Sequence, residues 1–152
     1  MINFLSFGII LFVLYNFKHS NFLFYSVKNI TMNKSTTVEI KWVDLDIQTF
    51  GSVQCDKYEE IFKGQYKLIT RRDKKFISEL NIYLKTISKM PPINHHVDTR
   101  YKILIKENDT LKVKICGNRF FININGITYK IPLEYIKWLN KNINNSWGNI
   151  EQ

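Results

Sequence analysis

The sequence contains no alanine, only two cysteines and three prolines, and no charged side chain in its first seventeen residues. The lack of alanine excludes an Ala-x-Ala cleavage site, the usual end of a secretory signal peptide. Ile, Asn, Lys, Phe and Tyr are abundant instead, a bias typical of an AT-rich genome. Such a bias raises the lysine content without a functional cause, so the formal net charge of +9 is weak evidence for any one kind of partner.

The two cysteines, Cys55 and Cys116, are not arranged as CxxC, which excludes a zinc ribbon and a thioredoxin-like motif. They are our candidates for one disulfide. We expect them to be bridged if the domain is exported, and reduced and partly buried if it stays in the cytosol.

The N-terminal segment, residues 1–31, differs from the rest of the chain. Residues 4–17 form an almost unbroken apolar run, but a membrane span needs roughly 18 to 20 apolar residues. No basic stretch precedes the run and no cysteine for lipid attachment follows it closely. Lys18 and Lys28 lie after the run, which would keep the domain in the cytoplasm if the segment spans a membrane.

Three interpretations of this segment remain: a membrane anchor, an export signal, or an upstream region outside a true start at Met32. We place a single small α+β domain at residues 32–152. Without Lys18 and Lys28 this domain has 20 basic and 13 acidic residues, a net charge of +7. That excess favours anionic partners, namely an acidic protein surface or an anionic membrane.

Hydrophobic periodicity predicts the elements of this domain. Residues 38–47 alternate as a strand with a slip at Trp42–Val43, and residues 55–62 fit a short helix. A short strand at 66–69 precedes a long helix, which Thr70 opens with Asp73 as the capping-box acid. Four strands then form a meander, and a final helix starts at Pro132, followed by a frayed tail from residue 144.

The turns of the meander predict its register. We expect a loop of three or five residues, because only an odd loop length puts the apolar residues on one face. A three-residue loop at 107–109 sets Ile105 opposite Leu111 and Lys102 opposite Lys114. Asn125–Gly126 is the preferred type I′ pair and sets Ile124 against Ile127. We therefore expect an α+β fold, with a mainly antiparallel sheet that ends in the four-strand meander and with helices packed on one face.

The candidate binding residues are four lysines on the outer face of this sheet, where an acidic partner would dock: Lys102, Lys106, Lys112 and Lys114. The competing interpretation is a solvated face that discourages edge aggregation. We do not expect nucleic acid as the partner, because Phe121 is the only aromatic residue that we can place on this face for base stacking.

Two groups of residues in the sequence could bind a metal or carry out catalysis. His95 and His96 precede Asp98, but no further Cys or His lies at a ligand spacing, so we predict neither a metal nor a cofactor. Cys55, one of these histidines and Asp98 follow an order that some cysteine hydrolases use, although no local nucleophile motif supports it. The alternative without a functional role is a solvated loop in which Asp98 pairs with Arg100.

The sequence loosely resembles uncharacterised small bacterial proteins that carry an export signal or a lipid-attachment cysteine. The shared pattern covers roughly residues 38–140 and consists of Cys55, Tyr58 and Phe62, then Asp98-x-Arg100, Cys116, Gly126 and Tyr129. The resemblance implies an α+β fold and no particular mechanism. This chain departs from the pattern because it lacks the lipid-attachment cysteine.

The sequence thus predicts a non-enzymatic binding domain, tethered to or exported across a membrane. One alternative is a cytosolic inhibitor of the toxin-immunity kind that starts at Met32. Another is a cysteine-dependent hydrolase that uses Cys55. The sequence does not specify a partner or an oligomeric state.

Overall fold

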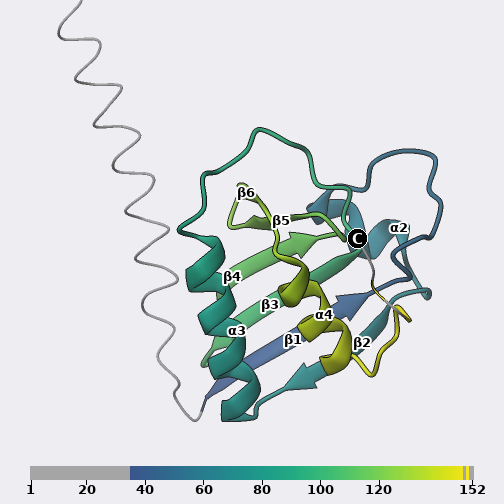
Figure 1. Cartoon of the computed structure of the whole chain (residues 1–152). Helices are drawn as coiled ribbons and strands as arrows, with labels where there is room; N and C mark the ends of the chain where they lie inside the picture. The colour runs from purple at the N-terminus through teal and green to yellow at the C-terminus, as the bar shows by residue number, and fades with distance from the viewer. Residues whose placement is uncertain (1–34, 149, 151–152) are drawn as a thin grey trace, which may run out of the picture.

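The computed structural model describes residues 35–148 and 150, so the segment 1–31 and its three interpretations lie outside the described residues. The described chain is an α+β domain with one six-stranded antiparallel sheet of order β2-β1-β3-β4-β5-β6 (Figure 1). Within this part, no helix is both long and apolar enough to cross a membrane. The strands are β1 Thr36–Trp42, β2 Lys67–Arg71, β3 Tyr101–Glu107, β4 Thr110–Gly117, β5 Phe121–Ile124 and β6 Ile127–Lys130.

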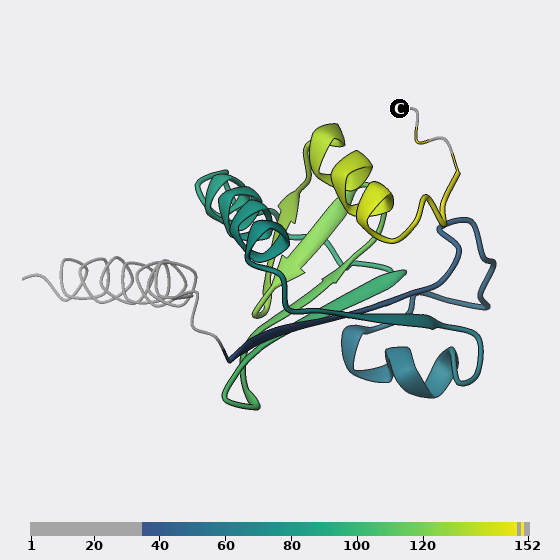
Figure 2. The same ribbon diagram turned by 90° about the horizontal axis from the view of Figure 1, so that it is seen from below.

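Helices cover both faces of this sheet. The two long ones, α3 (Lys74–Ile87) and α4 (Leu133–Asn142), lie on one face, where the main core is formed. The 3-10 turn η1 (Cys55–Lys57) and the short helix α2 (Tyr58–Ile61) lie on the other face (Figure 2). The prediction of helices on one face therefore holds only for the long pair.

The second face is covered because it has a small core of its own. Tyr58 and Phe62 are buried there against Val43 and Val53. Val43 follows β1, whose residues alternate strictly between buried and half-buried. The slip at Trp42–Val43 is the point at which the chain begins to bury side chains on the opposite face. Ile61, the last residue of α2, is about half exposed.

The β3–β4 hairpin corrects the predicted register. Its loop has two residues, Asn108 and Asp109, both with positive φ, and Ile105 pairs with Val113. The apolar residues still share a face because β4 contains an extra residue, Lys112, at a β-bulge. The extra residue at the bulge shifts the register of β4 by one position, as a loop with an odd number of residues would have done. The predicted pairing of Lys102 with Lys114 is therefore wrong, since Lys102 lies opposite Cys116.

The β5–β6 hairpin has the predicted geometry. Asn125 and Gly126 both have positive φ, and Ile124 pairs with Ile127. The side chain of Asn123 accepts a hydrogen bond from the Gly126 N–H, which fixes the turn. This hairpin was predictable because the turn residues and the apolar alternation specify the same register.

The predicted start of the long helix and the predicted frayed tail are both wrong. Asp73, and not Thr70, caps α3, because its Oδ1 accepts from the Phe76 N–H at 2.8 Å. Thr70 lies in β2. The tail after α4 is also packed against the core, since Trp147 is buried and its Nε1 donates to the Val43 carbonyl at 2.7 Å. The side-chain oxygen of Asn140 accepts from the Trp147 N–H and holds the tail in place.

Candidate binding surfaces

Three of the four predicted binding lysines are paired with carboxylates of the same chain. Lys102 lies 2.8 Å from Glu59, Lys114 lies 2.8 Å from Asp56, and Lys106 pairs with Glu39. Glu59 and Asp56 belong to the α2 and η1 segment that covers this face. Lys112, at the bulge, is exposed. An acidic partner at this face would have to compete with carboxylates that are already in place.

Glu59 is the centre of this paired face. Its two carboxylate oxygens contact Lys41 at 2.9 Å and Lys102 at 2.8 Å, and these lysines lie directly opposite each other on β1 and β3. Burial of the Glu59 carboxyl works to raise its pKa, but the hydrogen bonds from Lys102 and Lys41 outweigh this effect and lower the pKa. Glu59 therefore neutralises a like-charge pair that would otherwise weaken the ladder.

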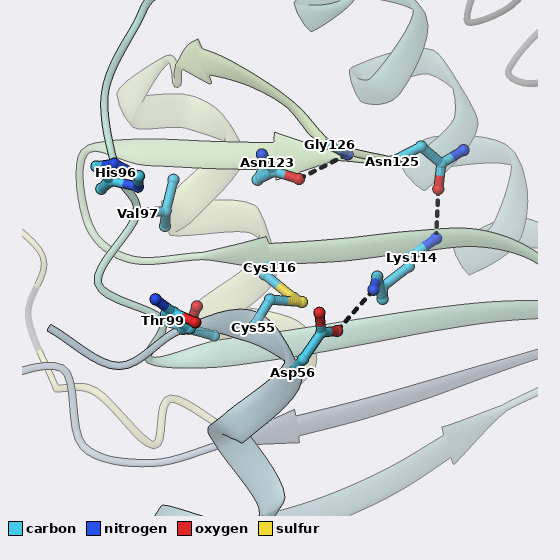
Figure 3. Close-up of a pocket in the computed structure, with 11 residues that line it drawn as sticks. Cys55, Asp56, His96, Val97, Thr99, Lys114, Cys116, Asn123, Asn125 and Gly126 are labelled. Carbon is cyan, nitrogen blue, oxygen red and sulfur yellow. Dashed lines mark hydrogen bonds and ion pairs between the residues drawn. A yellow bond between two sulfur atoms is a disulfide. The ribbon is translucent and has the colours of Figure 1, made fainter.

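The candidate disulfide is formed in the structure. Cys55 in η1 is bonded to Cys116 in β4, with the two Cα atoms 5.7 Å apart. The bond ties the covering segment to the sheet beside the ion pair of Asp56 and Lys114 (Figure 3). The sulfur of Cys55 is consumed by this bond, so it is not a free nucleophile here.

Residues 98–100 connect several loops at one end of the sheet. The Asp98 carboxylate accepts from the Val53 N–H at 2.8 Å and forms the predicted ion pair with Arg100 at 2.6 Å. The predicted solvated loop is wrong at this point, because Thr99 and Arg100 are buried. The backbone carbonyl of Arg100 accepts from the Val43 N–H. Asn118 also donates to the Asp98 carbonyl. Asp98 is thus engaged in structural contacts.

A shallow hollow of about 420 Å³ lies beside the disulfide. His96 and Asn123 face it from one side and Lys114 from the other (Figure 3). The His95 ring packs against the Phe121 ring in a tilted arrangement, with centroids 4.1 Å apart. Among residues 35–148 and 150, no group of three His, Cys, Asp or Glu side chains is placed to hold a metal ion. Polar side chains line the hollow, but its two charged residues, Asp56 and Lys114, already pair with each other.

A different cluster of cations has no carboxylate partners within the described part of the chain. We call it the basic edge; it comprises residues of β2 and of the start of α3, namely Lys67, Arg71, Arg72, Lys74 and Lys75. All but Arg71 are exposed, and no carboxylate of the described residues forms an ion pair with any of the five. The sequence analysis missed this cluster, although five cations within nine residues were a usable signal.

Local contacts at the basic edge leave a net positive charge, because Asp73 is the single acid among five cations. The Arg71 guanidinium donates to the Asn142 carbonyl at 2.7 Å, which is a neutral acceptor. The carboxylate of Asp73, the only acid in this stretch, caps α3. Lys74 and Lys75 occupy the first turn of α3, where the positive end of the helix dipole disfavours cations. The chain therefore keeps positive charge here against a local energetic preference.

A second exposed feature lies in the loop between β1 and η1. The side chain of Phe50 is fully exposed. The neighbouring Thr49 hydroxyl donates to the Gly51 carbonyl and accepts from Arg100. The loop is thus held in shape while its aromatic residue stays in solvent.

Comparison with known proteins identifies no relative for this arrangement. A scan against protein-family models, a search of curated proteins and a search of solved structures each found no match. The function must therefore be argued from the described residues.

Proposed function

We propose that this chain is a non-enzymatic binding domain that recognises an acidic protein partner through its basic edge. One observation carries the proposal: the cations of the basic edge form no ion pair with a carboxylate of the described residues, whereas Lys41, Lys102, Lys106 and Lys114 on the sheet face each do. An uncompensated cluster of one sign raises the local concentration of oppositely charged partners and speeds their association. The proposed partner is still an acidic protein, as expected from the sequence. Its proposed docking surface is now β2 and the start of α3, and no longer the face of β3 and β4.

We further propose that the domain is exported to an oxidising compartment, because a membrane tether through the segment 1–31 would place it in the cytoplasm by the charges of Lys18 and Lys28. The disulfide between Cys55 and Cys116 supports this, because such bonds persist mainly in extracytoplasmic environments. The mass of the protein from its native source tests the proposal after separate thiol alkylation of membrane and soluble fractions. A soluble species that starts at Met32 with two alkylated cysteines would favour the cytosolic inhibitor instead.

Charge reversal tests the docking surface. The probe is fluorescent poly-glutamate, and the variant is Lys67→Glu combined with Arg72→Glu. We expect its affinity to fall at least about tenfold, because two favourable charge contacts become repulsive. The matched control is Lys112→Glu combined with Lys130→Glu, which changes the net charge equally at exposed sites outside the basic edge. Equal losses in both variants would show that net charge alone drives binding and would overturn the assignment.

The same variants distinguish a protein partner from a membrane. Vesicles that contain a third phosphatidylserine serve as the second probe. We expect binding to these vesicles to be weak in the wild type and to change little with the edge substitutions. Strong vesicle binding that the edge substitutions abolish would replace the acidic protein with an anionic lipid surface.

A further inference from the structure

The basic edge coincides with an open edge of the sheet. β2 is the outermost strand and pairs only with β1, and the described residues supply no strand on its other side (Figure 1). The opposite edge, β6, is partly covered, because the Ile93 N–H donates to the Thr128 carbonyl. An open edge strand presents unpaired N–H and C=O groups that can accept another strand.

We propose that an extended acidic segment of the partner adds to β2 as a seventh, antiparallel strand. This inference rests on the proposed function and specifies how the partner binds. Every pairing in the sheet is antiparallel, and antiparallel pairs are slightly more stable per residue than parallel ones. Main-chain hydrogen bonds would supply affinity, and alternate side chains would supply specificity.

The side chains of β2 specify what such a segment must contain. Ile69 packs against the main core, so Lys67 and Arg71, which share its parity, lie on the side of α3 and α4. Leu68 lies opposite Lys41, on the other face, and is half exposed. An antiparallel partner therefore needs acids opposite Lys67 and Arg71 and apolar residues opposite Leu68 and Ile69.

Read from its N-terminus, the complementary segment is acid, any residue, apolar, apolar, acid. Its first acid would meet Arg71 and its last would meet Lys67. Residues that precede the first acid would continue past the end of β2 towards Arg72, Lys74 and Lys75, so further acids are expected there. The predicted ligand is thus a strand with an acidic N-terminal flank.

A synthetic peptide tests this geometry with the unmodified protein. The probe is Asp-Asp-Glu-Thr-Val-Leu-Glu, and its control replaces the four acids with lysine. Two further peptides carry N-methyl groups on alternate backbone nitrogens of the last five residues: Glu, Val and Glu in one, Thr and Leu in the other. In an antiparallel ladder only alternate N–H groups point to the neighbouring strand, so one methylated peptide blocks pairing and the other does not.

We expect the acidic peptide to bind, with amide NMR shifts concentrated in β2. The lysine control should not bind. One methylated peptide should lose at least about tenfold in affinity and the other less than about twofold. Equal affinities of the two methylated peptides would overturn strand addition while the acidic-partner proposal survives. Unchanged binding of the acidic peptide to the Lys67→Glu and Arg72→Glu variant would instead overturn the proposed function.

Discussion

The sheet face and the basic edge hold similar numbers of cations, but within the described residues those on the face are paired with carboxylates and those at the edge are not. On the face, Glu59 alone bridges Lys41 and Lys102, whose side chains are only 16% and 10% exposed. At the edge, five cations in nine residues meet no carboxylate of the described chain. Partly buried lysines need partners because desolvation penalises an unpaired charge, whereas exposed ones do not. The contrast separates cations that stabilise the fold from cations available for binding.

The comparison also shows why a lysine count from sequence does not separate paired cations from unpaired ones. The alternation in β3 and β4 correctly puts lysines on one face, but a covering segment with Asp56 and Glu59 neutralises them. That segment is distant in sequence from both strands. The basic edge required no long-range information, since its charges lie within a single short stretch.

The largest effect should follow loss of the disulfide that holds the covering segment on the paired face. Replacing Cys55 and Cys116 together by Ser should destabilise the domain by about 4 kcal/mol, because the bond closes a loop with a sequence separation of 61. Urea denaturation of wild-type and double-variant protein measures this difference. Hydrogen exchange should show the greatest loss of protection in η1 and α2. Loss of protection that is equal in β2 would contradict the localised role of the bond.

A smaller loss should follow removal of the shared carboxylate. Glu59→Gln leaves Lys41 and Lys102 facing each other without a counter-charge, so we expect a destabilisation of about 2 kcal/mol. Urea denaturation again provides the measurement. Glu60→Gln is the matched control, because Glu60 pairs with Lys57 and both side chains are more than half exposed. The control should shift stability by less than about 0.5 kcal/mol. Similar losses of stability in both variants would show that the partly buried ion pairs of Glu59 contribute no more than the exposed pair of Glu60.

The same carboxylate should make stability depend on acid pH. The pKa of Glu59 is lowered in the folded state from its ordinary value of 4.5. Its contribution is therefore fully present above that value and is lost as the pH falls through the lower, folded-state pKa. Thermal melts between pH 3 and 7 should show this loss in the wild type and a weaker acid dependence in Glu59→Gln. An identical pH profile for the two proteins would mean that Glu59 does not contribute to the acid sensitivity.

The parts of the fold that the sequence predicted are those in which neighbouring residues specify the structure. The alternation of β1 and the Asn125–Gly126 turn are local signals, and both were interpreted correctly. The bulge at Lys112 was missed because a two-residue turn and an extra residue mimic an odd loop. The packed tail was missed because its stability depends on Trp147 reaching Val43, which is 104 positions earlier. Such long-range contacts leave no periodic pattern in the chain.

The smallest expected effect on stability has the opposite sign and lies at the basic edge. Lys74→Glu combined with Lys75→Glu places two acids in the first turn of α3, where the helix dipole favours negative charge. We expect the domain to gain about 0.5–1 kcal/mol in urea denaturation. We also expect poly-glutamate binding to weaken, because two of the five unpaired cations are reversed.

A gain in stability together with a loss of poly-glutamate binding is the sharpest test of the comparison. Such a result would show that Lys74 and Lys75 serve binding at a cost in stability. The control is Lys85→Glu combined with Lys89→Glu, at exposed positions in the last turn of α3 and just beyond it. There acids oppose the dipole, so the control should lose stability and keep its binding. If the substitutions at the start of α3 destabilise the domain or leave poly-glutamate binding intact, then Lys74 and Lys75 do not serve the binding of an acidic partner.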